Sequence, residues 1–200
     1  MLISFEGIDG CGKSTQIKLL KEYFDQKGIK YSVFREPGGT EISERIRSLL
    51  LHETDEMHPI TELLLFSAAR SQLIQEKVLP LLQKNEIVIL DRFYDSTTAY
   101  QGYGRKSAEL KSIHVLNQLA THHTKPDLTF YLKIDPKEAE RRTSGNRKDR
   151  MENAGYQFFV DVSKGYDELA NNEERIHSID AMQSEVEVHA QIVSIIEKNH

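Results

Sequence analysis

Residues 7–14 read Gly7-Ile8-Asp9-Gly10-Cys11-Gly12-Lys13-Ser14, which matches the pattern G-x-x-x-x-G-K-[ST]. An apolar run precedes this stretch and a pattern with helical spacing follows it, which is the strand, turn and helix that the pattern requires. Glycines allow backbone N–H groups to surround a phosphate, Lys13 can reach the β- and γ-phosphates, and the Ser14 hydroxyl can ligate Mg²⁺. The sequence therefore predicts a phosphate loop that binds a nucleoside triphosphate.

The surrounding sequence alternates between strand and helix patterns. Short apolar runs predict five strands: Leu2 to Phe5, Tyr31 to Phe34, Ile87 to Leu90, Leu128 to Ile134, and Ile176 to Ile179. Helical spacing is found over Lys13 to Gln26, Glu41 to Leu51, Pro59 toward Pro80, Ser107 to His122, Pro136 to Arg142, Glu152 to Ala170, and Glu185 to Lys198. Strands separated by helices imply right-handed crossovers, so we predict an α/β fold with a mostly parallel sheet.

Composition narrows the class of protein. With 200 residues, 38% of them hydrophobic, and no recognisable linker, the chain is expected to form one domain over residues 1–200. A net charge of -5 argues against binding nucleic acid or an anionic membrane through bulk charge, and the apolar runs are too short to span a bilayer. The single cysteine, Cys11, and the absence of a secretory signal pattern predict a soluble, cytoplasmic protein.

Two further features concern the transferred phosphate. The apolar strand Ile87 to Leu90 is followed directly by Asp91, a carboxylate that suits a second Mg²⁺-linked group opposite the phosphate loop. Between residues 141 and 151 the chain has Arg141, Arg142, Arg147, Lys148 and Arg150, which is typical of a lid that closes over a nucleotide. A solvated basic loop or an RNA-binding patch is the alternative. No Asn-Lys-x-Asp stretch is present to read guanine, which disfavours a GTPase.

Residue spacing also indicates a pocket for an acceptor molecule. Phe66 and Arg70 lie four residues apart, as do Thr97 and Gln101, so each pair shares a face if its segment is helical. An aromatic face beside Arg, Thr and Gln can stack on a planar base and form hydrogen bonds with its edge. Spacing alone favours the simpler alternative, in which Phe66 is a core residue and Arg70 a solvated helix end.

Five motifs, in this order along the chain, resemble the thymidylate kinase family of the bacterial type. They are Phe5 to Thr15, Arg35-Glu36-Pro37-Gly38-Gly39-Thr40, Leu65 to Arg70, Asp91-Arg92-Phe93-Tyr94, and Ala99-Tyr100-Gln101-Gly102. The resemblance covers nearly the whole chain. It implies the three-layer phosphate-loop NTPase fold of the nucleoside-monophosphate-kinase type, with a five-stranded parallel sheet flanked by helices, and a homodimer.

The resemblance also assigns roles to individual residues. In the acceptor site, Asp9 is expected to meet the sugar 3'-hydroxyl of dTMP, and Arg47 and Arg92 to clamp its 5'-phosphate. Phe66 is expected to stack on thymine. The remaining dTMP-binding residues would be Arg70, Thr97 and Gln101 at the base edge, Tyr100 against a ribose 2'-hydroxyl, and Glu36 near the transferred phosphate. The family likeness further implies a cis Glu36-Pro37 bond.

On the ATP side, the resemblance assigns binding to a continuous loop and to one lid residue: Gly7, Ile8, Asp9, Gly10, Cys11, Gly12, Lys13, Ser14, Thr15, and Arg142 against adenine. Gly10 stands where eukaryotic-type relatives have an arginine, so the catalytic charge is expected to come from Arg147 or Arg150. Ala69 and Thr97 depart from the residues that are common in the family, but neither change removes a hydrogen-bond donor from the pocket.

Together these features predict transfer of the ATP γ-phosphoryl group to dTMP, giving dTDP and ADP for dTTP synthesis. The catalytic residues would be Lys13, Glu36, Arg92, Arg147 and Arg150, with Mg²⁺ held near Ser14 and Asp91. Two alternatives remain at this point: a deoxynucleoside kinase that phosphorylates a sugar 5'-hydroxyl, and a non-catalytic nucleotide-binding regulator.

Overall fold

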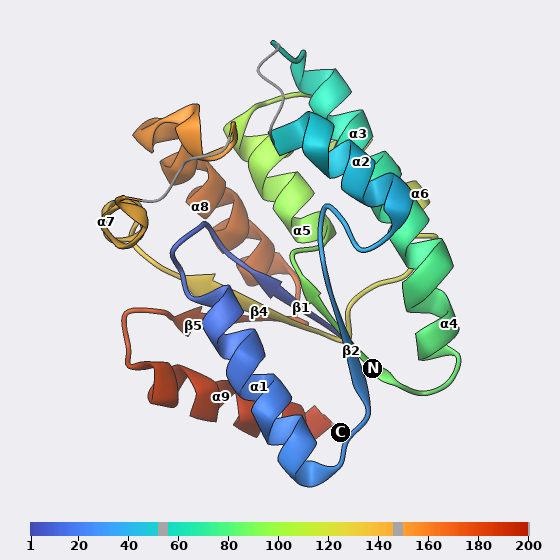
Figure 1. Ribbon diagram of the computed structural model, residues 1–200. Helices are drawn as coiled ribbons and strands as arrows, with labels where there is room; N and C mark the ends of the chain where they lie inside the picture. Colours follow the sequence, from blue (N-terminus) through green and yellow to red (C-terminus); the bar gives the residue numbers. More distant parts are fainter. Residues whose placement is uncertain (52–55, 146–149, 200) are drawn as a thin grey trace.

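The fold is built on a five-stranded parallel sheet (Figure 1). It was established from a computed structural model, which describes residues 1–51, 56–145 and 150–199. The strands are β1 (Leu2–Glu6), β2 (Tyr31–Arg35), β3 (Ile87–Asp91), β4 (Leu128–Lys133) and β5 (Ile176–Asp180). Their order is β2-β3-β1-β4-β5. The five predicted strands are confirmed, and each differs from its expected range by one residue at the carboxyl end.

The central strand β1 positions the phosphate loop. All five of its residues are buried, as expected for a parallel strand covered by helices on both faces. Phe5 is in register with Asp91 of β3 on one side and with Phe130 of β4 on the other. The carboxyl ends of β1 and β3 therefore lie side by side, which brings the phosphate loop next to the residues that follow β3.

Helices α1 (Lys13–Lys27) and α9 (Glu185–Asn199) cover one face of the sheet (Figure 1). Helix α1 packs its apolar stripe of Ile17, Leu20 and Phe24 inward. It ends at Gly28, whose φ of 67° lies in the left-handed region and whose N–H bonds back to the last turn, as the sequence predicts.

A second group of helices covers the other face of the sheet. These are α2 (Glu41–Leu51), α3 (Pro59–Leu73), α4 (Leu79–Leu82), α5 (Tyr94–Thr97), α6 (Leu110–Ala120) and α8 (Tyr156–Asn172). Helix α2 packs beside α3, and α3 beside α6 (Figure 1). Helix α7 (Pro136–Thr143) follows β4, near the phosphate loop.

Two π-helical segments interrupt the expected regular helices. Segment η1 (Ile74–Val78) joins α3 to α4, so the predicted long helix does not stop at Pro80 but continues to Leu82. The wider π turn precedes Pro80, which has no N–H for the helical hydrogen-bond ladder. Segment η2 (Thr98–Gly104) continues α5, so Thr97 and Gln101 lie on a helical segment, although not a purely α-helical one.

The structure shortens two predicted helices. The helix expected over Ser107 to His122 spans only α6, because Glu109 is extended and His122 has a φ of 51°. The helix expected from Glu152 begins only at Tyr156, as α8. A short 3₁₀ turn, η3 (Glu152–Ala154), precedes it, and Gly155 with a φ of 89° separates the two. Within the described ranges, no helix is long and apolar enough to cross a bilayer.

Candidate active site

A cavity of about 480 Å³ opens at the carboxyl edge of the sheet. Among its lining residues are sixteen predicted site residues: Asp9, Gly10, Gly12, Lys13, Ser14, Thr15, Glu36, Arg47, Phe66, Arg70, Asp91, Arg92, Thr97, Tyr100, Gln101 and Arg142. These residues come from six separate parts of the chain. The fold therefore gathers the predicted nucleotide and acceptor residues around one space.

The phosphate loop runs from β1 to the first turn of α1. Gly7 has a φ of 133°, and a side chain there would meet the Leu132 carbonyl oxygen at 2.7 Å. Gly10 has a φ of 85°, and a Cβ atom there would lie 2.7 Å from the Ala139 carbonyl oxygen of α7. Glycine is thus required at both positions, for conformation and for space. The contact at Gly10 therefore leaves no room for an arginine at this position of the loop.

Lys13 and Ser14 begin α1 and occupy different environments. The Lys13 side chain is 7% exposed, and its Nζ donates to the Gly7 carbonyl at 3.0 Å and lies 3.9 Å from Asp9 Oδ1. Ser14 is exposed and lines the cavity. Gly7, Ile8 and Cys11 do not line the cavity; the last two are buried beneath the loop, where Cys11 supports Lys13 through a 3.7 Å contact to its Sγ.

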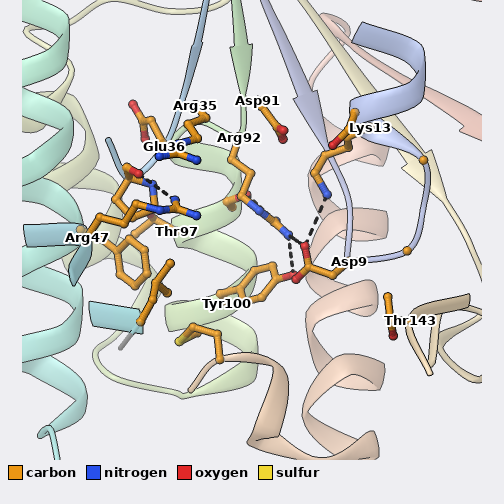
Figure 2. Close-up of a pocket in the computed structure, with 18 of the residues that line it drawn as sticks. Asp9, Lys13, Arg35, Glu36, Arg47, Asp91, Arg92, Thr97, Tyr100 and Thr143 are labelled. Carbon is orange, nitrogen blue, oxygen red and sulfur yellow. Dashed lines mark hydrogen bonds and ion pairs between the residues drawn. The ribbon is translucent and has the colours of Figure 1, made fainter. Parts of the chain in front are cut away.

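Arg92, directly after β3, crosses to the phosphate loop. Its Nη2 donates to Asp9 Oδ1 at 2.7 Å and to the Tyr100 hydroxyl at 3.2 Å, and its Nη1 donates to the Gly7 carbonyl at 3.0 Å. In Figure 2, Arg92 and Lys13 both point toward Asp9. Partial burial raises the pKa of Asp9, but the charges of Arg92 and Lys13 outweigh that effect and lower the pKa overall.

A buried carboxylate that sequence reasoning missed fixes the backbone around Arg92. Glu6, at the end of β1, accepts from the Phe93 N–H at 2.8 Å, from the Ser96 hydroxyl at 2.6 Å and from the Tyr166 hydroxyl at 3.0 Å. Burial raises the pKa of Glu6 to about 7. Arg92 itself has a φ of 70°, a left-handed conformation that costs a residue with a side chain about 1–2 kcal/mol. The bonds to Glu6 hold this turn in place.

The other end of the cavity, where the acceptor is predicted to bind, contains a buried ion pair. Arg70 Nε donates to Glu36 Oε2 at 2.7 Å, and its Nη1 donates to the Thr97 hydroxyl at 2.8 Å. The Glu36-Pro37 bond is cis, as the family resemblance implies. Burial raises the pKa of Glu36, and Arg70 opposes the shift. Glu36 Oε1 is buried and has no hydrogen-bond partner among the described residues, so it can accept a donor or join a metal shell.

Phe66, Gln101 and Arg47 complete the acceptor end. Phe66 stands one helical turn before Arg70 on α3 and lines the cavity, as the spacing predicts. Gln101 is 2% exposed and donates from Nε2 to Glu62 Oε1 at 2.8 Å. Arg47 donates to the Pro37 carbonyl at 2.8 Å. One aromatic ring and several hydrogen-bonding groups therefore border the same space.

The structure places the predicted lid arginines differently. Arg142 lines the cavity from the end of α7 and donates to the Ala181 carbonyl at 3.2 Å. Arg147 lies outside the described residues. Arg150 does not line the cavity: its guanidinium forms a 2.7 Å ion pair with Glu62 and donates to the Leu50 carbonyl at 2.8 Å. A contact between Arg150 and a phosphate would require this ion pair to break.

Six lining residues were not predicted as site residues: Arg35, Pro37, Leu51, Ser96, Thr143 and Met151. Arg35 ends β2, at the carboxyl edge where parallel sheets bind ligands, so its position after the strand is a signal that could have found it. Met151 and Thr143 have no such signal. They reach the cavity because α7 and the segment before α8 return to this edge.

The oxygen atoms at the cavity fit a small hard cation. Ser14 offers a hydroxyl and Asp91 a carboxylate, and both line the cavity, while Glu36 Oε1 is a buried oxygen with no partner in the described ranges. In the described part of the chain, no three His, Cys, Asp or Glu side chains form a metal cluster. One hydroxyl and one or two carboxylates can hold a divalent cation when phosphate oxygens and water complete its shell.

Comparisons with known proteins agree with this geometry. The family model for thymidylate kinase matches residues 5–192. The thymidylate kinase of Caldanaerobacter subterraneus subsp. tengcongensis is 45% identical over 197 residues, which cover 98% of this chain and 94% of the relative. The thymidylate kinase of Chlorobaculum tepidum is 45% identical over 208 residues, with 98% and 97% covered. The crystal structure of thymidylate kinase from Ehrlichia chaffeensis superposes with a TM-score of 0.79 at 34% identity, covering 98% of both chains. The chain belongs to the thymidylate kinase family.

Proposed function

We propose that this protein transfers the γ-phosphoryl group of ATP to the 5'-phosphate of dTMP, giving ADP and dTDP for dTTP synthesis. The observation that carries this proposal is a single cavity with the phosphate loop at one end and Phe66, Arg70 and Gln101 at the other. Arg92 joins the two ends through Asp9. A donor phosphate and an acceptor phosphate bound in these two parts would meet beside Arg92 and Lys13.

The donor side binds ATP through the phosphate loop. Backbone N–H groups of residues 7–15 surround the phosphates at the positive end of α1, and Lys13 reaches the β- and γ-oxygens. Arg142, which lines the cavity, packs on adenine. Ser14 and Asp91 hold Mg²⁺, which neutralises charge on the phosphates when it is bound.

The acceptor side binds dTMP through one contact for each part of the nucleotide. Phe66 stacks on thymine, while Arg70, Thr97 and Gln101 bind its polar edge. Asp9 accepts from the 3'-hydroxyl, and Tyr100, which is 6% exposed, leaves little room for a ribose 2'-hydroxyl. Arg47 and Arg92 bind the 5'-phosphate, and Glu36 stands near the transferred group.

The chemistry needs positioning and charge stabilisation rather than a covalent intermediate. The 5'-phosphate oxygen of dTMP attacks the γ-phosphorus as the bond to the β-γ bridging oxygen breaks, so the phosphoryl group passes to dTMP and ADP leaves. Lys13 and Arg92 stabilise the negative charge on the transferred oxygens, and one lid arginine, Arg147 or Arg150, contributes when the segment closes.

A coupled assay of ADP release tests this function against both alternatives. We expect turnover with ATP and dTMP, little with dCMP or dGMP, and none with thymidine. Turnover of thymidine would identify a deoxynucleoside kinase, and ATP binding without turnover of any monophosphate would identify a regulator. Omission of Mg²⁺ in the same assay should abolish turnover, which tests the metal assignment.

We also propose that the protein forms a homodimer through α2, α3 and α6. Exposed apolar side chains gather on these three neighbouring helices: Ile42, Leu49, Ile60, Leu64, Val115 and Leu119. Leu119 is 69% exposed, and an apolar stripe of this kind is typical of an interface between subunits.

The reducing cytoplasm, where the free Cys11 would remain a thiol, is the proposed compartment.

Sedimentation velocity tests the dimer. The wild type should sediment as a dimer, and Leu119→Asp should sediment as a folded monomer, because a charge would be buried at the interface. Val186→Asp is a matched control, since Val186 is 76% exposed on α9, on the opposite face of the sheet. A monomeric wild type, or a Leu119→Asp variant that remains dimeric, would contradict this interface.

A further inference from the structure

A buried carboxylate outside the cavity lining is connected to the base-binding end of the site. Glu62 is 1% exposed and lies on α3, one helical turn before Phe66. It does not line the cavity, and none of the roles above uses it. In the part of the chain that the structure describes, its side-chain partners are Gln101 of η2, Arg105 and Arg150.

The two arginines compensate the buried charge of Glu62. Arg150 Nη1 lies 2.7 Å from Oε2, and Arg105 Nε lies 3.5 Å from Oε1. Both arginines are held by other contacts as well: Arg150 donates to the Leu50 carbonyl at 2.8 Å, and Arg105 stacks over the Phe158 ring at 4.8 Å. Because a buried carboxylate is costly without such partners, this cluster fixes Glu62 in one position.

That fixed carboxylate determines the orientation of the Gln101 amide. A carboxylate only accepts hydrogen bonds, so the NH₂ end of Gln101 must face Glu62, at 2.8 Å from Oε1. The carbonyl oxygen of Gln101 is then the acceptor that remains available on this lining residue. Without Glu62, the two ends of the amide could exchange at little cost.

We propose that Glu62 is a positioning residue that makes Gln101 present a carbonyl oxygen to the nucleobase and thereby selects thymine over cytosine. Thymine carries a donor at N3 and an acceptor at O4, which match the Gln101 carbonyl and the donating Arg70. Cytosine carries an acceptor at N3 and an amine at C4, so both contacts would become repulsive. This inference rests on the proposed function and deepens it.

The test is the ratio of kcat/KM for dTMP to that for dCMP in Glu62→Gln. A neutral amide at position 62 lets the Gln101 amide turn over, so we expect the ratio to fall at least about tenfold, as for loss of one well-placed polar contact. The ratio for dTMP to dUMP should stay within about twofold, since uracil presents the same edge as thymine. A merely structural defect would not separate these two ratios.

A double-mutant comparison sharpens the test. In a Gln101→Ala background, Glu62→Gln should change the dTMP to dCMP ratio by less than about twofold, because the amide that Glu62 orients is gone. Asp95→Asn is the matched control: Asp95 is also 1% exposed and pairs with Arg175 at 2.8 Å, but it does not line the cavity. We expect this control to lower the melting temperature and leave the ratio unchanged.

Glu62→Asp covers the case in which Glu62→Gln does not fold. It retains the charge beside Arg105 and Arg150 but withdraws the carboxylate by one methylene, so the ratio should fall in the same direction. The inference is overturned if a folded position-62 variant keeps its dTMP to dCMP ratio within twofold, or if dUMP discrimination changes equally. A wild type that does not phosphorylate dTMP would instead overturn the proposed function.

Discussion

Arg92 Nη2 and Asp9 Oδ1 lie 2.7 Å apart, and this ion pair joins the residue after β3 to the phosphate loop after β1. The same guanidinium donates to the Gly7 carbonyl at 3.0 Å. The Arg92 side chain therefore contacts both a backbone group and a side chain of the phosphate loop. Since β1 and β3 pair in register up to Phe5 and Asp91, the rigid sheet sets this distance. The cation is therefore positioned before any phosphate binds.

We expect Lys13→Ala and Arg92→Ala each to lower kcat by about 10²–10³-fold or more, because each removes a charge that stabilises the transferred oxygens. Circular dichroism should show an intact fold in both variants. Arg45→Ala is a suitable control, since Arg45 is 77% exposed and forms an ion pair with Glu41 of the same helix. Near-normal turnover in either active-site variant would contradict the proposed mechanism.

The acceptor pocket makes a separate prediction. Phe66→Ala should raise the KM for dTMP about tenfold or more, because stacking on a base contributes about 1–3 kcal/mol, while the KM for ATP changes by less than about threefold. Gln101→Ala should act in the same direction. Steady-state kinetics with each substrate varied in turn separates the two constants. Equal losses for both substrates would place these side chains outside the dTMP pocket.

The two lid arginines, Arg147 and Arg150, are predicted to differ in their effect on kcat. Arg147→Ala should lower kcat by more than about 10²-fold, as expected for an arginine that acts on a transferred phosphate. Arg150→Ala should lower the melting temperature and affect kcat less, because Glu62 holds this side chain at 2.7 Å. Lys148→Ala serves as a control in the same segment. If both single variants and the double variant keep kcat within about threefold, catalytic charge must come from another residue, such as Arg142.

Glu6 makes a prediction about pH. Burial raises its pKa from 4.5 to about 7, so between these values the folded protein holds a proton that the unfolded chain has lost. The stability that this raised pKa gives the folded state is fully present below pH 4.5 and is lost as pH rises through 7. Glu6→Gln cannot titrate. Its unfolding free energy relative to wild type should therefore increase from pH 5 to pH 8, by about 2.5 kcal/mol if about 1.4 kcal/mol corresponds to each pKa unit.

Urea denaturation at several pH values measures this difference directly. Comparison with the variant at each pH cancels the titration of other groups, including His177 and His189, whose pKa values burial lowers. A difference that stays constant across this range would show that Glu6 does not titrate there. The interpretation of Glu6 as a buried, proton-binding support for the Arg92 turn would then be wrong.

Local pattern was sufficient for much of this protein. Apolar runs located all five strands, and the order of strands and helices gave the parallel sheet, because burial on both faces leaves a signal within each short segment. The phosphate loop could also be predicted locally, because its glycines, Lys13 and Ser14 form one continuous stretch of sequence. The family resemblance then identified side chains, such as Phe66 and Arg70, whose spacing alone was ambiguous between site and core.

The tertiary structure decided the features that depend on partners distant in the sequence. Glu62 meets Gln101 and Arg150, 39 residues away in the first case, and Glu6 meets Tyr166 across 160 residues. No periodicity marks a carboxylate as buried and paired, because its environment comes from elements that other segments bring beside it. The sequence by itself determined the sheet and the phosphate loop through local backbone and burial preferences; which charges meet in the interior was decided only when those elements packed.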